Sequence, residues 1–124
     1  MDRTVVSDWL GRYIRAWESN EAEEIAALFT EDAVYSYGPF SADVVGRDAI
    51  AMSWLEDPDE PGSWEAEYHP IAIDGQTAIA NGRSRYFNAD RSLKDEYDNI
   101  FLIRFDADGR CAEFREWFMK RPPG

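Results

Sequence analysis

Hydrophobic residues recur at helical spacing in the first part of the chain and in alternation in the second. Trp9, Tyr13 and Trp17 stand four residues apart and share one face of a predicted helix over residues 4–19. Charged residues such as Arg12 occupy the opposite face. The pattern therefore predicts an amphipathic helix that packs its aromatic stripe against the rest of the domain.

Two shorter helices and one strand are expected next. Asn20 is typical of a helix start, and Glu23 stands where a capping-box partner would be, so a second helix is expected to begin at Asn20. A β-branched and aromatic run predicts a short strand over residues 33–37. A third helix is expected over residues 47–56, ending before Pro58.

From residue 64 onward the chain is typical of a β-meander. Asp74-Gly75 is a strong hairpin signal, and a second turn is expected over residues 106–109. The predicted strands cover residues 64–73, 77–88, 96–106 and 110–120. Helices followed by a hairpin-linked sheet indicate one α+β domain over residues 1–124, in which a curved antiparallel sheet wraps around three N-terminal helices.

Composition narrows the class of partner. The formal net charge is −12, with 25 acidic and 13 basic residues, which disfavours both nucleic acid and anionic membrane surfaces. Cys111 is the only cysteine, so an internal disulfide is impossible and a cytoplasmic protein is expected. No cofactor motif and no metal-binding spacing of His and Cys is present, so neither a cofactor nor a metal is expected.

The aromatic content, 15% of residues, exceeds what a small core needs and predicts an internal pocket for a small apolar or aromatic ligand. The alternative is that these rings simply form the core. The residues expected to line the pocket are Trp17, Phe29, Tyr35, Tyr37, Trp54, Tyr86, Asn99, Phe101, Phe114 and Phe118.

Glu116 is the first candidate for chemistry. Alternation in the last strand puts it on the same face as Phe114 and Phe118, where desolvation would raise its pKa toward neutrality and suit general acid/base catalysis. Two alternatives stay open. A one-residue shift in register would turn the side chain to solvent. Alternatively, Glu116 could form a structural ion pair with Arg83, Arg85 or Arg104.

His69 and Asn99 are the other polar candidates on strands. His69, the only histidine, is expected to point inward by alternation with Ile71 and Ile73, as a base or a hydrogen-bonding group for the ligand. Asn99 shares a face with Phe101 and could present its amide to the pocket. For both residues a purely structural role is the alternative.

Four segments carry a family resemblance. Residues 12–17, 25–34, 46–50 and 103–117 resemble SnoaL-like and ketosteroid-isomerase-like domains, which share the cystatin-like fold of nuclear transport factors. The resemblance implies a cone-shaped shell with an internal pocket. It leaves the function open, because this shell hosts isomerases, cyclases, dehydratases, epoxide hydrolases, ligand-binding proteins and dimerisation modules.

The resemblance assigns roles unevenly. Tyr13 matches the isomerase tyrosine that donates a hydrogen bond to the substrate oxyanion. The isomerase base falls on Tyr37 or Gly38 and its second acid on Phe101, so isomerisation by that mechanism is not expected. Glu116 falls where SnoaL-like polyketide cyclases place their acid/base aspartate.

Three functions follow as competing hypotheses. The first is an enzyme that transfers protons on a hydrophobic carbonyl or polyketide-like ligand, with Glu116, His69 and Tyr13 as catalytic residues. The second is a module that binds a ligand without reaction. The third is a homodimer-forming module, with its contacts on the opposite face of the sheet at Ile79, Leu102 and Trp117.

Overall fold

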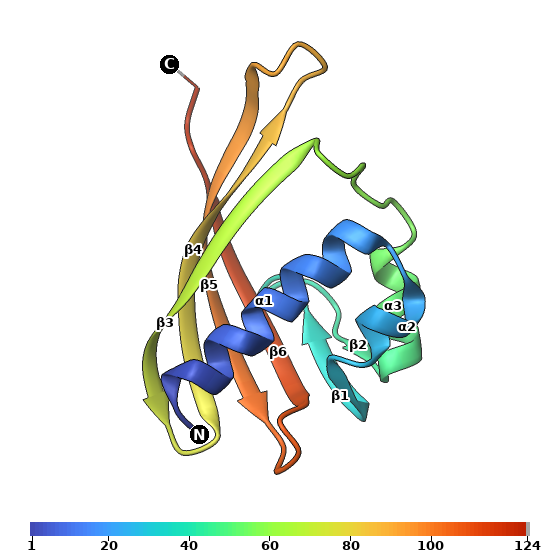
Figure 1. Cartoon of the computed structure of the whole chain (residues 1–124), viewed down its shortest axis with the longest axis vertical. Coiled ribbons are helices and arrows are strands. Elements are labelled where there is room, and N and C mark those ends of the chain that lie inside the picture. Colours follow the sequence, from blue (N-terminus) through green and yellow to red (C-terminus); the bar gives the residue numbers. More distant parts are fainter. Residues whose placement is uncertain (124) are drawn as a thin grey trace.

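The computed structural model describes residues 1–123 and has three helices and six strands (Figure 1). The helices are α1 (Arg3–Ser19), α2 (Ala22–Ala26) and α3 (Arg47–Trp54). The strands are β1 (Phe29–Ser36), β2 (Val44–Val45), β3 (Trp64–Asp74), β4 (Thr77–Phe87), β5 (Leu93–Phe105) and β6 (Cys111–Lys120). The predicted α+β class with a curved sheet and three helices is confirmed.

One six-stranded sheet runs in the order β2-β1-β6-β5-β4-β3. Strands β3 to β6 form an antiparallel meander, as expected. β1 pairs in parallel with β6, so the sheet is mixed and not wholly antiparallel. The alternation of single strands does not reveal this pairing, because it carries no information about the direction of the neighbouring strand.

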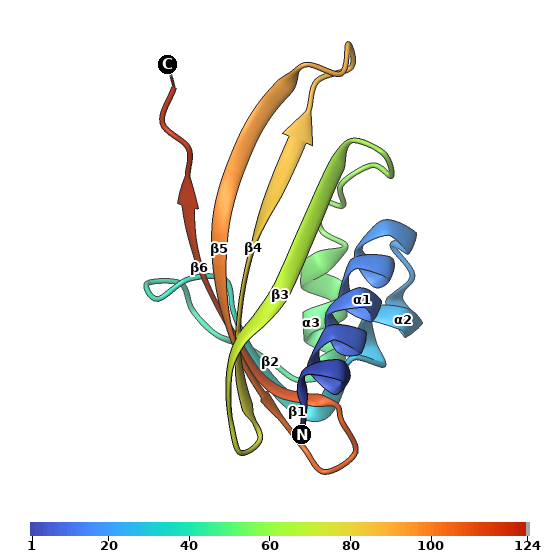
Figure 2. The same cartoon turned by 60° about the vertical axis from the view of Figure 1, so that its left-hand side comes forward.

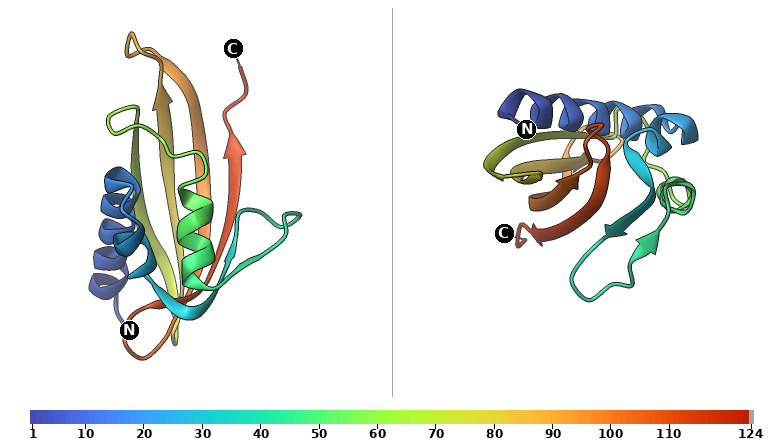
Figure 3. Two further views of the ribbon diagram at one scale, coloured as in Figure 1. Left: turned by 90° about the vertical axis from the view of Figure 1, so that its right-hand side faces the viewer. Right: turned by 90° about the horizontal axis from the view of Figure 1, so that it is seen from below.

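The helices all lie on one side of the curved sheet (Figures 2 and 3). α1 packs against β3 and α3 packs against β1. The buried side chains form one continuous cluster, in which Trp9 contacts both Phe29 and Phe114 with ring centroids 6.1 Å apart. The indole of Trp9 also donates to the backbone carbonyl of Leu28 at 3.1 Å, which ties α1 to the start of β1.

The start of the second helix differs from the prediction. Asn20 ends α1 in a left-handed conformation with φ of 54°, and its backbone N–H donates to the carbonyl of Ala16. Asn tolerates this conformation better than most residues, so it serves here as a C-cap and not as an N-cap. α2 begins at Ala22 with Glu21 as its N-cap, and no capping-box bond forms.

The inward and outward faces of β3 are also reversed relative to the prediction. Trp64, Tyr68 and Pro70 are buried, whereas His69 and Ile71 face solvent. The register of β3 against β4 then shifts between Pro70 and Ala72. A register shift interrupts the alternation of inward and outward side chains. The orientation of Ile73, beyond the shift, therefore does not tell which way His69 points.

Candidate functional site

A cavity of about 530 Å³ opens between the helices and the concave face of the sheet. Helices α1 and α3, strands β1 and β3–β6 and the segment between α3 and β3 all contribute side chains. Nine of the thirteen candidate residues line it: Tyr13, Trp17, Tyr35, Tyr37, Trp54, Tyr86, Asn99, Glu116 and Phe118. Whether any of them binds a ligand or takes part in a reaction stays a prediction.

Tyrosines and phenylalanines separate sharply in this fold. All six tyrosines of the chain line the cavity, whereas Phe118 is the one phenylalanine of residues 1–123 that does so. A tyrosine needs a polar partner or water for its hydroxyl, whereas a phenylalanine can be enclosed completely. The cavity is therefore aromatic in area and polar at the tips of its rings.

Glu116 projects into the cavity from β6. Register pairs it with Phe101 of β5, and the side-chain amide of the neighbouring Asn99 donates to its Oε2 at 2.9 Å. Asn99 in turn accepts from the hydroxyl of Ser84 at 3.2 Å. This chain of two hydrogen bonds crosses three strands and fixes the orientation of the carboxyl group.

Burial raises the pKa of Glu116 to about 7, against the opposing effect of the hydrogen bond from Asn99. The register that would turn Glu116 to solvent is not the one found. The three expected arginines pair with other acids: Arg83 with Asp98, Arg85 with Glu96 and Arg104 with Glu113. Within residues 1–123 Glu116 forms no ion pair, so its carboxyl group can take up and release a proton near neutral pH.

Two tyrosine hydroxyls meet on the helix side of the cavity. The hydroxyls of Tyr13 and Tyr35 are hydrogen-bonded at 3.3 Å. Burial, followed by the nearby tyrosines and Glu116, raises the pKa of Tyr13 well above its ordinary value, and burial followed by Glu116 does the same for Tyr35. Both groups therefore keep their protons and act as hydrogen-bond donors.

His69 lies outside this site. Its imidazole is 66% exposed, and Nε2 contacts the Oε1 of Glu67 at 2.7 Å on the outer side of β3. The predicted inward orientation is wrong, because the inward residues of this strand are its even-numbered ones from Trp64 to Pro70. His69 cannot reach a molecule in the cavity without a rearrangement of the strand.

Three expected lining residues form the layer beneath the cavity. Phe29, Phe101 and Phe114 are fully buried and do not line it. The ring of Phe114 stacks on Tyr35 with centroids 4.7 Å apart, and Phe101 packs against Tyr68 at 4.6 Å. These three residues therefore belong to the hydrophobic core, which was the alternative to a place in the pocket lining.

Sequence reasoning missed two tyrosines and the polar opening. Tyr68 and Tyr97 line the cavity but were not among the expected residues. The opening carries Glu56, Asp57, Asp59, Lys94 and Asp95. Tyr68 and Tyr97 could have been predicted from their residue type, because a tyrosine hydroxyl needs a polar partner or water. The acidic opening could not, because it depends on how the segment before β3 folds.

Among residues 1–123, no three His, Cys, Asp or Glu side chains come together in a way that could hold a metal ion. None of the helices in the same part of the chain is long and apolar enough to cross a membrane.

Comparisons with known proteins identify the family. A family model described as SnoaL-like domain matches residues 10–114. The structure is similar to a solved structure of SalBIII, described as an epoxide hydrolase/cyclase-like enzyme in pyran ring formation in the polyether salinomycin. The two chains are 16% identical, the match covers 90% of this chain and 88% of that one, and the TM-score is 0.69, a likeness that shows the fold alone. Comparison with curated proteins gives no match.

Proposed function

Because this chain belongs to the SnoaL-like domain family, we propose that it binds a small, largely apolar molecule in the cavity and transfers protons on it through Glu116. The observation that carries the proposal is the buried Glu116 carboxyl group, whose pKa is raised to about 7 in a cavity lined by aromatic rings. A group that is half protonated near neutral pH can serve as general acid or general base.

The surrounding groups suit this role. Asn99 holds one carboxyl oxygen of Glu116 at 2.9 Å, which leaves the other oxygen to face a ligand. The protonated hydroxyls of Tyr13 and Tyr35 can donate to oxygen as negative charge develops on it. Asn99 would therefore act as a positioning residue, and Tyr13 as the stabiliser of an oxyanion.

The reaction class follows from this arrangement. Proton transfer beside hydrogen-bond donors supports isomerisation, dehydration or ring formation on a hydrophobic carbonyl or polyketide-like molecule. The fold neighbour SalBIII, described as epoxide hydrolase/cyclase-like, adds ring closure and epoxide opening to the reactions worth testing. The proposed mechanism needs no metal and no cofactor.

A non-catalytic binding protein is the second candidate. It is favoured by the position of His69, because only one of the two expected acid–base side chains faces the cavity. A single carboxyl group with hydroxyl donors is also a complete site for recognition of a polar group on an apolar ligand.

The Glu116→Gln variant distinguishes these candidates. We would incubate the protein with a panel of aryl epoxides and aromatic β-hydroxyketones and follow products by mass spectrometry. Glu116→Gln should lower any observed rate by about 100-fold or more, which is typical for loss of a general acid or base. Glu67→Gln, which removes an exposed carboxylate on the outer side of β3, is the matched control and should keep the full rate.

The outcomes separate cleanly. A full rate in Glu116→Gln would refute the proposed mechanism. Binding of the panel compounds without any turnover in the unchanged protein would favour the binding candidate. Failure to bind any of them would count against both.

We also propose a homodimer formed through the outer face of the sheet and a cytoplasmic location. Ile79 and Leu102 are paired across β4 and β5, and Trp117, 42% exposed, lies nearby on β6. Sedimentation equilibrium that finds only monomers at micromolar concentration would rule the dimer out.

The single cysteine, which is buried and has no second cysteine in the chain to pair with, supports the cytoplasmic location. The open cavity offers no support for a purely assembly role.

A further inference from the structure

The opening of the cavity is strongly acidic. Glu56, Asp57 and Asp59 lie on the short segment that joins α3 to β3, and Asp95 lies on β5. Lys94 is the one basic residue of residues 1–123 that lines the cavity. Asp95 is already paired with Lys120 at 3.0 Å. Within the described part of the chain, Lys94 is therefore the one positive charge in the lining that could offset the carboxylates of the joining segment.

The joining segment is held against the aromatic wall. The indole N–H of Trp17 donates to the Oδ2 of Asp59 at 3.0 Å, and the side-chain amide of Asn20 donates to the backbone carbonyl of Asp59 at 3.2 Å. Burial, followed by the charge of Asp59, raises the pKa of Tyr86. The carboxylate of Asp59 is therefore fixed against the wall, whereas Glu56 and Asp57 are exposed beside it.

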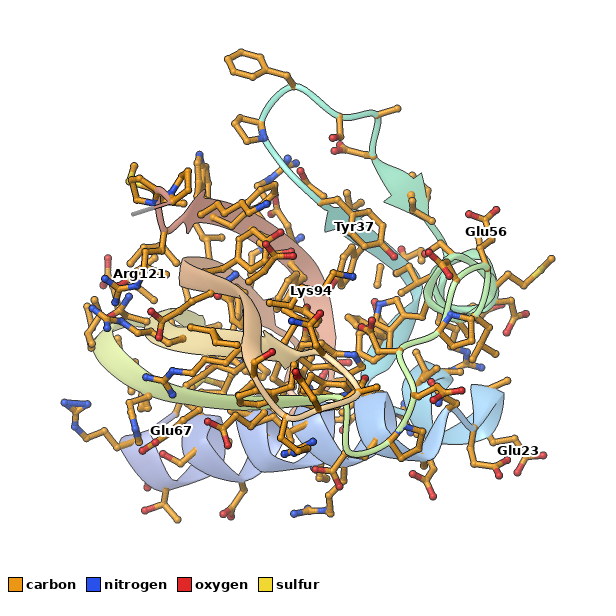
Figure 4. All side chains as sticks on the ribbon, turned by 90° about the horizontal axis from the view of Figure 1, so that it is seen from above. Glu23, Tyr37, Glu56, Glu67, Lys94 and Arg121 are labelled. Atoms are coloured by element: carbon orange, nitrogen blue, oxygen red, sulfur yellow. The ribbon has the colours of Figure 1, made fainter. Side chains whose placement is uncertain are left out.

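Aromatic rings surround the same opening. Trp17 and Tyr86 have centroids 6.2 Å apart, and Tyr97 meets Tyr86 and Phe118 edge-on at 5.8 and 5.7 Å. Figure 4 looks onto this end of the molecule, with Tyr37 and Lys94 toward the middle and Glu23 and Glu67 on the outside. Rings next to carboxylates form the surroundings that favour an organic cation, because the ring faces are electron-rich.

We propose that the ligand of this cavity carries a nitrogen cation, a protonated amine or a quaternary ammonium, on an apolar body. The cation lies at the opening, against the ring of Tyr86 and beside the carboxylates of Asp57 and Asp59, and the apolar body extends past the tyrosines toward Glu116. This inference rests on the proposed function only in that the cavity binds a small apolar molecule.

The same charges disfavour anionic ligands. A phosphate, a carboxylate or a substrate delivered on an acidic carrier protein would approach a molecule of net charge −12 through a ring of carboxylates. The arrangement thus selects against the anionic forms in which many small metabolites are presented to enzymes.

Three probes of matched shape test the proposal by calorimetric titration at low ionic strength. They are phenethyltrimethylammonium, its neutral isostere (3,3-dimethylbutyl)benzene, and the anion 4-phenylbutanoate. The cation should bind about tenfold more tightly than the isostere, and the anion should bind most weakly. Added salt should reduce the preference for the cation, because part of it comes from charges near solvent.

A pair of double variants locates the effect. Asp57→Asn with Asp59→Asn removes two charges while keeping an oxygen that can accept from Trp17, and the cation preference should fall to about twofold or less. Glu23→Gln with Glu24→Gln removes the same charge from the exposed surface of α2 and should keep the preference.

Each remaining result overturns the inference in a recognisable way. Equal binding of the cation and the neutral isostere would refute it while leaving the proposed function intact. An unchanged preference in the Asp57/Asp59 variant would show that the opening does not select the cation. Absence of binding for all three probes would refute both the inference and the proposed function.

Discussion

Replacement of Glu116 by glutamine should change how stability depends on pH. The folded state holds the carboxyl group with a pKa of about 7, against an ordinary value of 4.5, because burial penalises the charged form. Folding therefore favours the protonated group. Its stabilising effect is complete below about pH 4.5 and is lost as the pH rises through about 7.

The magnitude follows from the same two values. At about 1.4 kcal/mol for each pKa unit, the ionised carboxylate costs the folded state up to about 3 kcal/mol at pH 8. Glutamine has nearly the same shape, and its carbonyl oxygen can still accept the hydrogen bond from Asn99. The variant thus removes the ionisation and keeps the contact.

Urea denaturation of both proteins at about pH 5 and about pH 8 measures the effect. The free energy of unfolding of Glu116→Gln, relative to the unchanged protein, should rise by about 2 kcal/mol between the two pH values, since part of the effect is already present at pH 5. Glu67→Gln, exposed on β3, should show no such change. Parallel pH profiles for Glu116→Gln and the unchanged protein would refute the reasoning.

Two glycine substitutions should act in opposite directions. A Cβ at position 82 would stand 1.9 Å from the backbone oxygen of Glu67, so Gly82→Ala should destabilise the fold by about 3 kcal/mol or more through separation of β3 from β4. Gly11 lies within α1, where the nearest atom to a new Cβ is 3.4 Å away on Arg15, so Gly11→Ala should stabilise by about 0.5–1 kcal/mol. Thermal unfolding of both variants checks the pair, and a melting temperature that rises for Gly82→Ala or falls for Gly11→Ala would contradict it.

Local patterns predicted most of the elements and failed where an interaction between distant segments decides. α1 follows from its aromatic stripe, and the Asp74-Gly75 turn joins β3 to β4 where expected. The parallel pairing of β1 with β6 and the two-residue strand β2 were not predicted. Both features depend on which segments of the chain become neighbours in the sheet, and the periodicity of a single segment carries no information about its neighbours.

The candidate site shows the same division. Glu116 could be predicted because its neighbours Phe114 and Phe118 define a face within one strand. His69 could not, because Ile71, the apolar residue on its face, is itself exposed, and Ile73 lies beyond the register shift between Pro70 and Ala72. Phe29 and Phe101 were expected at the cavity because all aromatic rings were treated as equivalent. In the structure, the rings with a phenolic hydroxyl line the cavity, and these two phenylalanines are buried in the core.

The parallel contact between β1 and β6 also predicts an order of assembly. Phe29 is paired with Cys111, whereas the hairpins β3–β4 and β4–β5 join segments that are adjacent in the chain. Pairings between residues far apart in sequence form against a larger loss of chain entropy and so come after the local ones. Because β6 also carries Glu116, the step that completes the sheet brings its carboxyl group into the same compartment as Tyr13 and Tyr35. We therefore expect a partly folded chain to form its hairpins before the cavity is complete.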